Sequence, residues 1–170
     1  MVANTGTYLD SPFHRYAEGK DLADLDLKVL ANLDGVVVRT NHRVITAAHI
    51  AALDVRNKAV LFHTGWDRHW RTDRYYDGSH SFLSSDAAEY LVAGGAALVG
   101  IDSYNIDDTA ALDRPAHSIL LAKGIPIVEH LCNLASVPEQ GFKFFAVPVK
   151  VRDFGTFPVR AFAMVAKAAG

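Results

Sequence analysis

Short apolar runs separated by polar turns are the main feature of the chain. Each run is continuous and rich in β-branched or large apolar residues, which is typical of strands buried on both faces. We expect six strands of this kind, at residues 35–40, 59–63, 97–102, 125–129, 142–151 and 157–165. The last two predict a pair of strands that completes the sheet.

Helical patterns lie between these runs. We expect helices or helical turns at residues 21–30, 46–53, 85–92 and 115–123. The third begins at a serine cap and ends at Gly94-Gly95, and the fourth begins with Pro115 and ends at Gly124. Strands that alternate with helices before a final strand pair predict an α/β fold with a mixed sheet and flanking helices. No repeat or linker divides the chain, so we expect a single domain over residues 1–170.

Composition argues against several classes of function. The net charge of −2 does not fit a nucleic-acid-binding surface, which would normally be basic. No apolar run reaches the ~18 residues that a membrane span needs, and the polar start of the chain shows no signal peptide. The only cysteine, Cys132, excludes an intramolecular disulfide, and its apolar surroundings predict a buried structural thiol. These features favour a cytoplasmic protein that acts on a small molecule.

Chemically useful residues are concentrated in residues 4–14, which read Asn-Thr-Gly-Thr-Tyr-Leu-Asp-Ser-Pro-Phe-His. If the segment is extended, the side chains of Tyr8 and Asp10 share one face, because side chains alternate along a strand. Pro12 favours a bend after that strand, and the bend can bring His14 to the same place. The segment can therefore direct several polar groups into one cleft.

This segment resembles the signature of the cyclase-like metal-dependent hydrolase family, which includes bacterial kynurenine formamidase and isatin hydrolase. The signature reads His-x-Gly-Thr-His-x-Asp-x-Pro-x-His, and the chain matches it at Gly6, Thr7, Asp10, Pro12 and His14. Asn4 and Tyr8 stand where the family has its two other histidines. The resemblance continues through Thr64-Gly65-Trp66, Gly100-Ile101-Asp102, and His117 with Glu129 twelve positions later. It implies a β/β/α cyclase-like (swivelling) fold.

The resemblance also bears on the chain's start and assembly. Family members usually carry strands ahead of the signature, and this chain begins three residues before it, so we expect a domain that lacks those N-terminal strands. An unpaired sheet edge is a surface that proteins usually cover. We therefore expect a homo-oligomer, most simply a dimer.

Four residues are candidates for one site, although each also has a structural explanation. Asp10 can brace a turn, His14 can lie on the surface, and His117 can be a structural residue of its helix. Glu129 ends an apolar strand, where a buried carboxylate needs a partner or a metal ion. The resemblance implies that Asp10, His117 and Glu129 are metal ligands.

Further implied ligands and roles follow from the same resemblance. Asn4 would offer only a neutral amide oxygen, and Tyr8 a phenol that ionises near pH ~10. The remaining three ligands suit a single zinc or manganese ion better than two ions. His14 would be the general acid/base, with Tyr8 as a second catalytic group.

The implied activity is hydrolysis of a carbon–nitrogen bond in a small amide, aryl-formamide or lactam. Two alternatives remain open on the sequence. One is a metal-free enzyme in which Tyr8 and His14 form an acid/base pair, with Glu129 or Asp10 tuning the histidine. The other is a non-catalytic protein that binds a small molecule after losing its metal ligands.

An aromatic, arginine-rich segment at residues 66–80 contains almost no aliphatic side chain. Such side chains suit a planar or anionic ligand, so we expect Trp66, Trp70 and Phe13 to bind substrate. The alternative is that these aromatic rings pack on the body of the protein or on a partner subunit.

Overall fold

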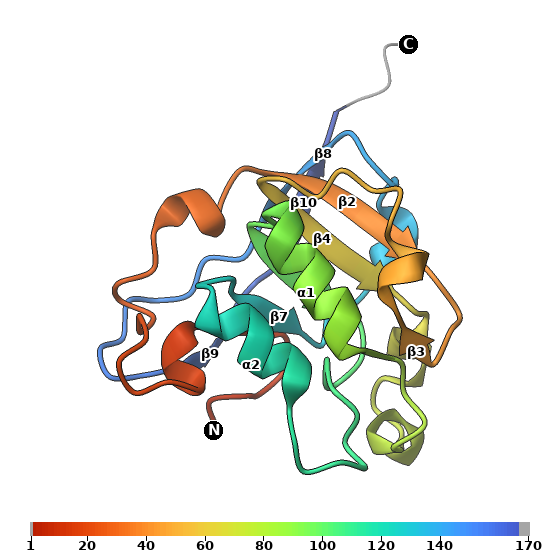
Figure 1. The fold of residues 1–170 in the computed structure, drawn as a ribbon, viewed down its shortest axis with the longest axis horizontal. Coiled ribbons are helices and arrows are strands. Elements are labelled where there is room, and N and C mark those ends of the chain that lie inside the picture. The colour runs from red at the N-terminus through yellow and green to blue at the C-terminus, as the bar shows by residue number, and fades with distance from the viewer. Residues whose placement is uncertain (1, 167–170) are drawn as a thin grey trace.

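The computed structural model describes residues 2–166 and contains one large mixed sheet with two α-helices on one face (Figure 1). The strand order is β10-β8-β2-β4-β6-β7-β1-β9. The bounds are β1 Tyr8–Asp10, β2 Leu33–Arg39, β4 Lys58–His63, β6 Leu98–Ile101, β7 Ile127–Glu129, β8 Phe142–Phe145, β9 Thr156–Pro158 and β10 Phe162–Val165. The four central strands, β2, β4, β6 and β7, are parallel, and antiparallel strands flank them on both sides.

The helices agree with the sequence pattern. Helix α1 spans Ser85–Gly94 and ends at Gly95, whose φ of 76° is a left-handed conformation that suits glycine. Helix α2 spans Pro115–Ala122. The shorter segments form single 3₁₀ turns, at η1 Pro12–His14, η2 Leu27–Val29, η3 Ala47–His49, η4 Trp66–His69, η5 Asp73–Tyr76 and η6 Leu134–Ser136. A small parallel pair, β3 Val44–Ile45 and β5 Phe82–Leu83, lies apart from the main sheet. Among residues 2–166, no helix has the length and apolar character required to cross a membrane.

Side chains of the central strands alternate between two apolar cores. Val36 and Val38 of β2 join Phe62 of β4 in the core beneath α1 and α2. Val37 and Leu61 point to the opposite face, where they pack in a second core. Burial on both faces explains why these strands are continuous apolar runs in the sequence.

The prediction of one strand at residues 157–165 is wrong, and the reason lies in the shape of the sheet. Residues 157–165 do not form one strand; they divide into β9 and β10, which lie at opposite edges of the eight-stranded sheet. Only residues 159–161 connect these edges, and so short a segment spans at most about 14 Å. The sheet must therefore curl until its edges approach each other. The predicted strand 142–151 is also shorter, because β8 ends at Phe145, before Pro148.

Cys132 is exposed, so the prediction of a buried thiol is wrong. The chain leaves the sheet directly after β7, through left-handed φ values of 56° at His130 and 62° at Asn133. These turns direct Leu131 into the core and Cys132 to the surface.

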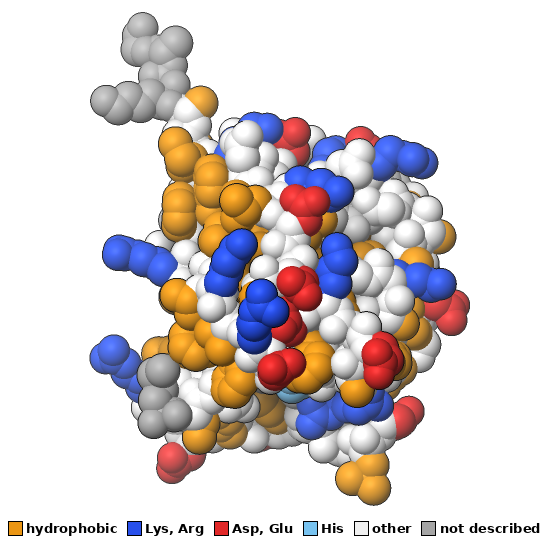
Figure 2. Space-filling model, turned by 90° about the vertical axis from the view of Figure 1, so that its left-hand side faces the viewer, with side chains coloured by type: hydrophobic (Ala, Val, Ile, Leu, Met, Phe, Trp, Pro, Cys, Tyr) orange, Lys and Arg blue, Asp and Glu red, His pale blue; other side chains and the backbone are white. Residues whose placement is uncertain are grey.

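The edge at β10 exposes apolar side chains, including Phe162, Met164 and Val165. Figure 2 shows hydrophobic side chains gathered along the left-hand margin of the face, with acidic and basic side chains mixed over much of the remaining face. The dimer was predicted instead from an open edge at the signature strand, and that edge is not open, because β1 pairs with β7 on one side and β9 on the other. The homodimer itself stays a prediction.

A close backbone approach joins the start of β9 to the turn that carries His14. The amide of Ser11 donates to the carbonyl oxygen of Gly155 at 2.7 Å. A Cβ added at Gly155 would lie 2.4 Å from the backbone nitrogen and Cα of His14. Gly155 therefore allows the two segments to contact.

We predict that Gly155→Ala destabilises the fold by about 1–3 kcal/mol, because backbone atoms cannot move aside as a flexible side chain can. Chemical denaturation measures the change. Gly78→Ala is the matched control, since its added Cβ would meet no atom closer than 3.8 Å. Equal stability of the two variants would contradict the proposed close approach.

Candidate active site

Strand register places four polar side chains on one face of the sheet. In the antiparallel ladder Tyr8 pairs with Glu129, and Asp10 pairs with Thr156. Directly paired residues share a face, and so do residues two apart on one strand. Leu9, between Tyr8 and Asp10, points into the opposite apolar core. The shared face predicted for Tyr8 and Asp10 is confirmed.

Helix α2 supplies the next group, His117, and a buried aspartate positions it. Asp107 accepts hydrogen bonds from the backbone amides of Ala116 at 2.6 Å and His117 at 3.1 Å, at the start of the helix. Its carboxylate also lies 2.6 Å from His117 Nδ1. Asp107 therefore caps α2 and fixes the orientation of the imidazole at once.

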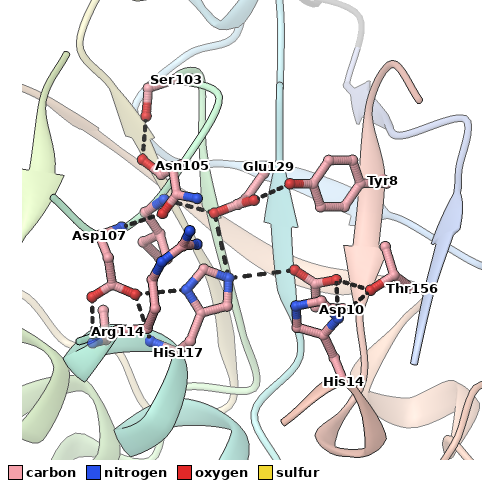
Figure 3. Close-up of polar contacts among 12 residues, drawn as sticks. Tyr8, Asp10, His14, Ser103, Asn105, Asp107, Arg114, His117, Glu129 and Thr156 are labelled. Atoms are coloured by element: carbon pink, nitrogen blue, oxygen red, sulfur yellow. Dashed lines mark hydrogen bonds and ion pairs between the residues drawn. The ribbon is translucent and has the colours of Figure 1, made fainter. Parts of the chain in front are cut away.

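The other ring nitrogen of His117 faces two carboxylates (Figure 3). Nε2 lies 3.5 Å from Asp10 Oδ2 and 3.6 Å from Glu129 Oε1. Burial opposes protonation of this imidazole, but the carboxylates of Glu129, Asp10 and Asp107 outweigh burial and raise the pKa of His117 to about 10. The site therefore favours a positive charge at this point, either a proton or a metal ion.

Glu129 is fully enclosed and held at both oxygens. The amide of Ile106 donates to Oε1 at 2.6 Å, and the hydroxyl of Tyr8 donates to Oε2. Burial is the main reason that the pKa of Glu129 rises to about 7, although His117 acts in the opposite direction. Burial, together with the carboxylates of Glu129 and Asp10, also raises the pKa of Tyr8 well above its usual value. The phenol therefore stays protonated and acts as a hydrogen-bond donor.

A threonine connects Asp10 to His14. Thr156 Oγ1 donates to Asp10 Oδ1, because an ionised carboxylate can only accept. The same oxygen lies 2.6 Å from His14 Nδ1, which must therefore carry the hydrogen. His14 Nε2 is then the basic nitrogen, on a side chain that is 43% exposed.

The cluster offers candidate ligands for a metal ion. Asp10 Oδ2 is buried without a hydrogen-bond partner among the described residues, which is costly unless another group occupies the site. His117 Nε2 lies 3.5 Å from Asp10 Oδ2, close to the roughly 3.4 Å that separates ligands bonded at ~2.1 Å in tetrahedral geometry. Asp10, His14 and His117 also offer ligand atoms that lie within 4.8 Å of one another.

A second group of possible ligands, His63, Asp67 and Asp102, has a structural explanation. Asp102 accepts from the amides of Thr64 and Gly65 at 2.9 and 2.7 Å, and from the Thr64 hydroxyl at 2.6 Å. These bonds hold the turn after β4. The downstream resemblance at Thr64-Gly65 and Asp102 therefore marks a conformational anchor outside the cluster around His117.

A cavity of about 970 Å³ opens over the cluster. Its lining includes Tyr8, Phe13, His14, Tyr76, Tyr104, Asn105, Thr109, Arg114, His117, Glu129, His130, Phe154 and Thr156. The exposed Asn4 also lines the cavity, and its role as a ligand stays a prediction.

The two tryptophans expected to bind substrate are not among the residues that line this cavity. Trp66 is buried and donates from Nε1 to the carbonyl oxygen of Tyr75 at 2.9 Å. Trp70 packs edge-on against Tyr75 and His130. Both rings therefore support the cavity wall from behind, as the packing alternative for this segment proposed. Phe13 does line the cavity.

The fold brings together Tyr8, Asp10, His14, His117 and Glu129, as the sequence predicted. Asp107 and Thr156 were not predicted as site residues. A signal for Asp107 existed, because α2 begins after Arg114, which cannot cap a helix with its side chain. Thr156 gave no local signal, since it meets Asp10 only through strand pairing across the sheet.

These features define an α/β protein with a buried cluster of carboxylates and histidine below an open cavity. The family model named Cyclase, described as "Putative cyclase", matches residues 1–108. Kynurenine formamidase from Salinibacter ruber is 32% identical over 163 residues, covering 95% of this chain and 76% of that protein. Kynurenine formamidase from Geobacillus thermodenitrificans is 30% identical over 162 residues, with the same coverage of each chain. The chain belongs to the cyclase-like metal-dependent hydrolase family.

Solved structures support the fold. The structure of a "Potential Metal-Dependent Hydrolase With Cyclase Activity" superimposes with a TM-score of 0.83 at 30% identity, covering 95% of this chain and 78% of that one. An isatin hydrolase bound to the product analogue thioisatinate gives a TM-score of 0.88 at 23% identity, covering 98% and 74%. The predicted cyclase-like α/β fold is confirmed.

We predict that Asp107→Ala destabilises the protein by about 2–4 kcal/mol, because it removes the cap of α2 and leaves the His117 ring without its buried partner. Urea denaturation measures the loss. Asp108→Ala is the neighbouring control, since Asp108 is only partly buried and pairs with the exposed Arg43. A loss no greater than that of the control would exclude the capping role.

Proposed function

We propose that this chain hydrolyses the carbon–nitrogen bond of a small amide, with aryl-formamides and cyclic amides as the substrate classes. The observation that best supports this proposal is the position of His14, whose basic Nε2 belongs to a side chain that lines the cavity over Asp10, His117 and Glu129. The names of the relatives, kynurenine formamidase and isatin hydrolase, indicate the same type of bond.

The residues of the chain have separate tasks in this reaction. His14 Nε2 accepts a proton from the attacking water as the water oxygen bonds to the amide carbon. The resulting imidazolium then donates that proton to the leaving nitrogen as the carbon–nitrogen bond breaks. Thr156 keeps Nδ1 protonated throughout, so that Nε2 is the nitrogen that exchanges protons. The products are a carboxylic acid and an amine.

We propose that Asp10, His117 and Glu129 would hold one zinc or manganese ion, with His14 nearby. When bound, such an ion polarises a carbonyl group and makes a bound water more acidic. Asp107 accepts the hydrogen of His117 Nδ1, so Nε2 would be the nitrogen available to the ion once its own proton is displaced. Tyr8 orients Glu129 through its hydrogen bond.

A metal-free enzyme is the second candidate, and the hydrogen bond from Tyr8 to Glu129 favours it. Here His117 is the imidazolium that neutralises Asp10, and Tyr8 and His14 supply acid and base. The non-catalytic binding protein remains the outcome if no amide substrate is turned over.

We predict that His14→Ala lowers turnover of an aryl-formamide by about 10²-fold or more, the usual scale for a general acid/base. Folding should change little, because the His14 side chain is 43% exposed. Product formation and thermal unfolding measure the two effects. His42→Ala, which removes an exposed histidine outside the cavity, is the control. Full activity of His14→Ala would refute the catalytic assignment.

We predict that the metal-free chain binds one zinc or manganese ion, and that Asp10→Asn weakens this binding on the order of a hundredfold. Asp10 is chosen because its Oδ2 is buried and has no hydrogen-bond partner among the described residues. Isothermal titration calorimetry gives the affinity and the number of ions. Asp67→Asn is the control, because Asp67 belongs to the other group of possible ligands. Turnover of an aryl-formamide without any metal binding would instead establish the metal-free alternative.

A further inference from the structure

Arg114 is unlike every other arginine of residues 2–166. The others are exposed, whereas Arg114 is half-buried and lines the cavity over the active site. The guanidinium groups of Arg15, Arg39 and Arg43 make hydrogen bonds or ion pairs. The side chain of Arg114 makes neither within the described part of the chain. A half-buried guanidinium without a hydrogen-bond partner among the described residues is well suited to an anionic ligand.

The position of Arg114 directs those donors towards the reacting region. The residue lies immediately before α2, three positions before His117, and shares the cavity wall with Asn105 and Glu129. In Figure 3 its side chain extends from the start of α2, beside His117, towards Asn105. Its positive charge also acts against the rise in the pKa of Tyr8. Arg114 therefore faces the same space as the predicted catalytic groups.

Aromatic rings lie around the same space. Tyr76 and Tyr104 line the cavity with their ring centroids 5.6 Å apart, and Phe13 and Phe154 also contribute to the lining. Flat rings can pack against such side chains, while a guanidinium binds a carboxylate with two parallel hydrogen bonds. The cavity thus combines surfaces for an aryl ring and for a negative group.

We propose that Arg114 is a specificity-determining residue that binds a carboxylate on the substrate, so that the preferred substrates are aryl amides carrying a carboxylate. This inference rests on the proposed amide hydrolysis and narrows its substrate class. The carboxylate does not take part in bond cleavage. Its pairing with Arg114 orients the aryl group, and the amide carbonyl can then lie beside His14.

The test compares 2-formamidobenzoate with formanilide, which lacks the carboxylate. Arg114→Gln should lower the ratio of their kcat/KM values by roughly ten- to hundredfold, as expected for loss of a charge-assisted hydrogen-bond pair. Arg114→Lys should recover part of the ratio, because it restores the charge without the planar fork. Arg15→Gln is the control: it removes an exposed charge whose side chain bonds Ser118 on α2, and it should leave the ratio within about twofold.

Binding of benzoate, with benzamide as its uncharged counterpart, tests Arg114 independently of catalysis. Calorimetry should show that Arg114→Gln weakens benzoate binding about tenfold or more, with circular dichroism confirming that the variant is folded. Equal benzoate affinity in the wild type and Arg114→Gln, or an unchanged kcat/KM ratio, would overturn the role of Arg114. Absence of turnover of both formamides by the wild type would instead count against the proposed hydrolysis, and benzoate binding would still decide the role of Arg114.

Discussion

His117 is buried between three carboxylates, with Asp107 at one ring nitrogen and Asp10 with Glu129 at the other. Charged groups removed from water are costly unless they are paired, and removing one partner leaves the rest uncompensated. These four residues come from α2, the segment before it, β1 and β7. Their pairing therefore fixes where α2 lies over the sheet, and the cavity above depends on that placement.

The same cluster accommodates the phenol of Tyr8. Tyr8 stays protonated because burial and two nearby carboxylates raise its pKa. Its hydroxyl donates to Glu129 and satisfies an oxygen that would otherwise be buried without a partner. This hydrogen bond fixes the orientation of Glu129, on the side of His117 where the site favours a positive charge.

Local patterns predicted the parts of the fold that local physics determines. The parallel strands are buried on both faces, so their apolar runs were readable, and so were the glycine and proline signals at the ends of α1 and α2. The pattern could not separate β9 from β10, because both are short, apolar and close in sequence, and only the curl of the sheet sends them to opposite edges. The exposed Cys132 was missed because left-handed turns at His130 and Asn133 carry no obvious signal in an apolar sequence.

In the candidate site, too, the residues that lie on one strand were predictable, and those that meet only through pairing of distant strands were not. Asp10 and Tyr8 were predictable together because alternation along one strand places them on one face. Thr156 orients His14 from a strand 146 positions away from Asp10, through a contact that only the ladder between β1 and β9 creates. Gly155, next to it, allows the backbone of β9 to approach His14. The exposed His14 is thus held by the edge of the sheet, while the buried cluster is held by the interior of the sheet and by α2. A substrate that reaches both must lie across the cavity between them, which is why the shape and charge of the cavity wall decide which amide is bound.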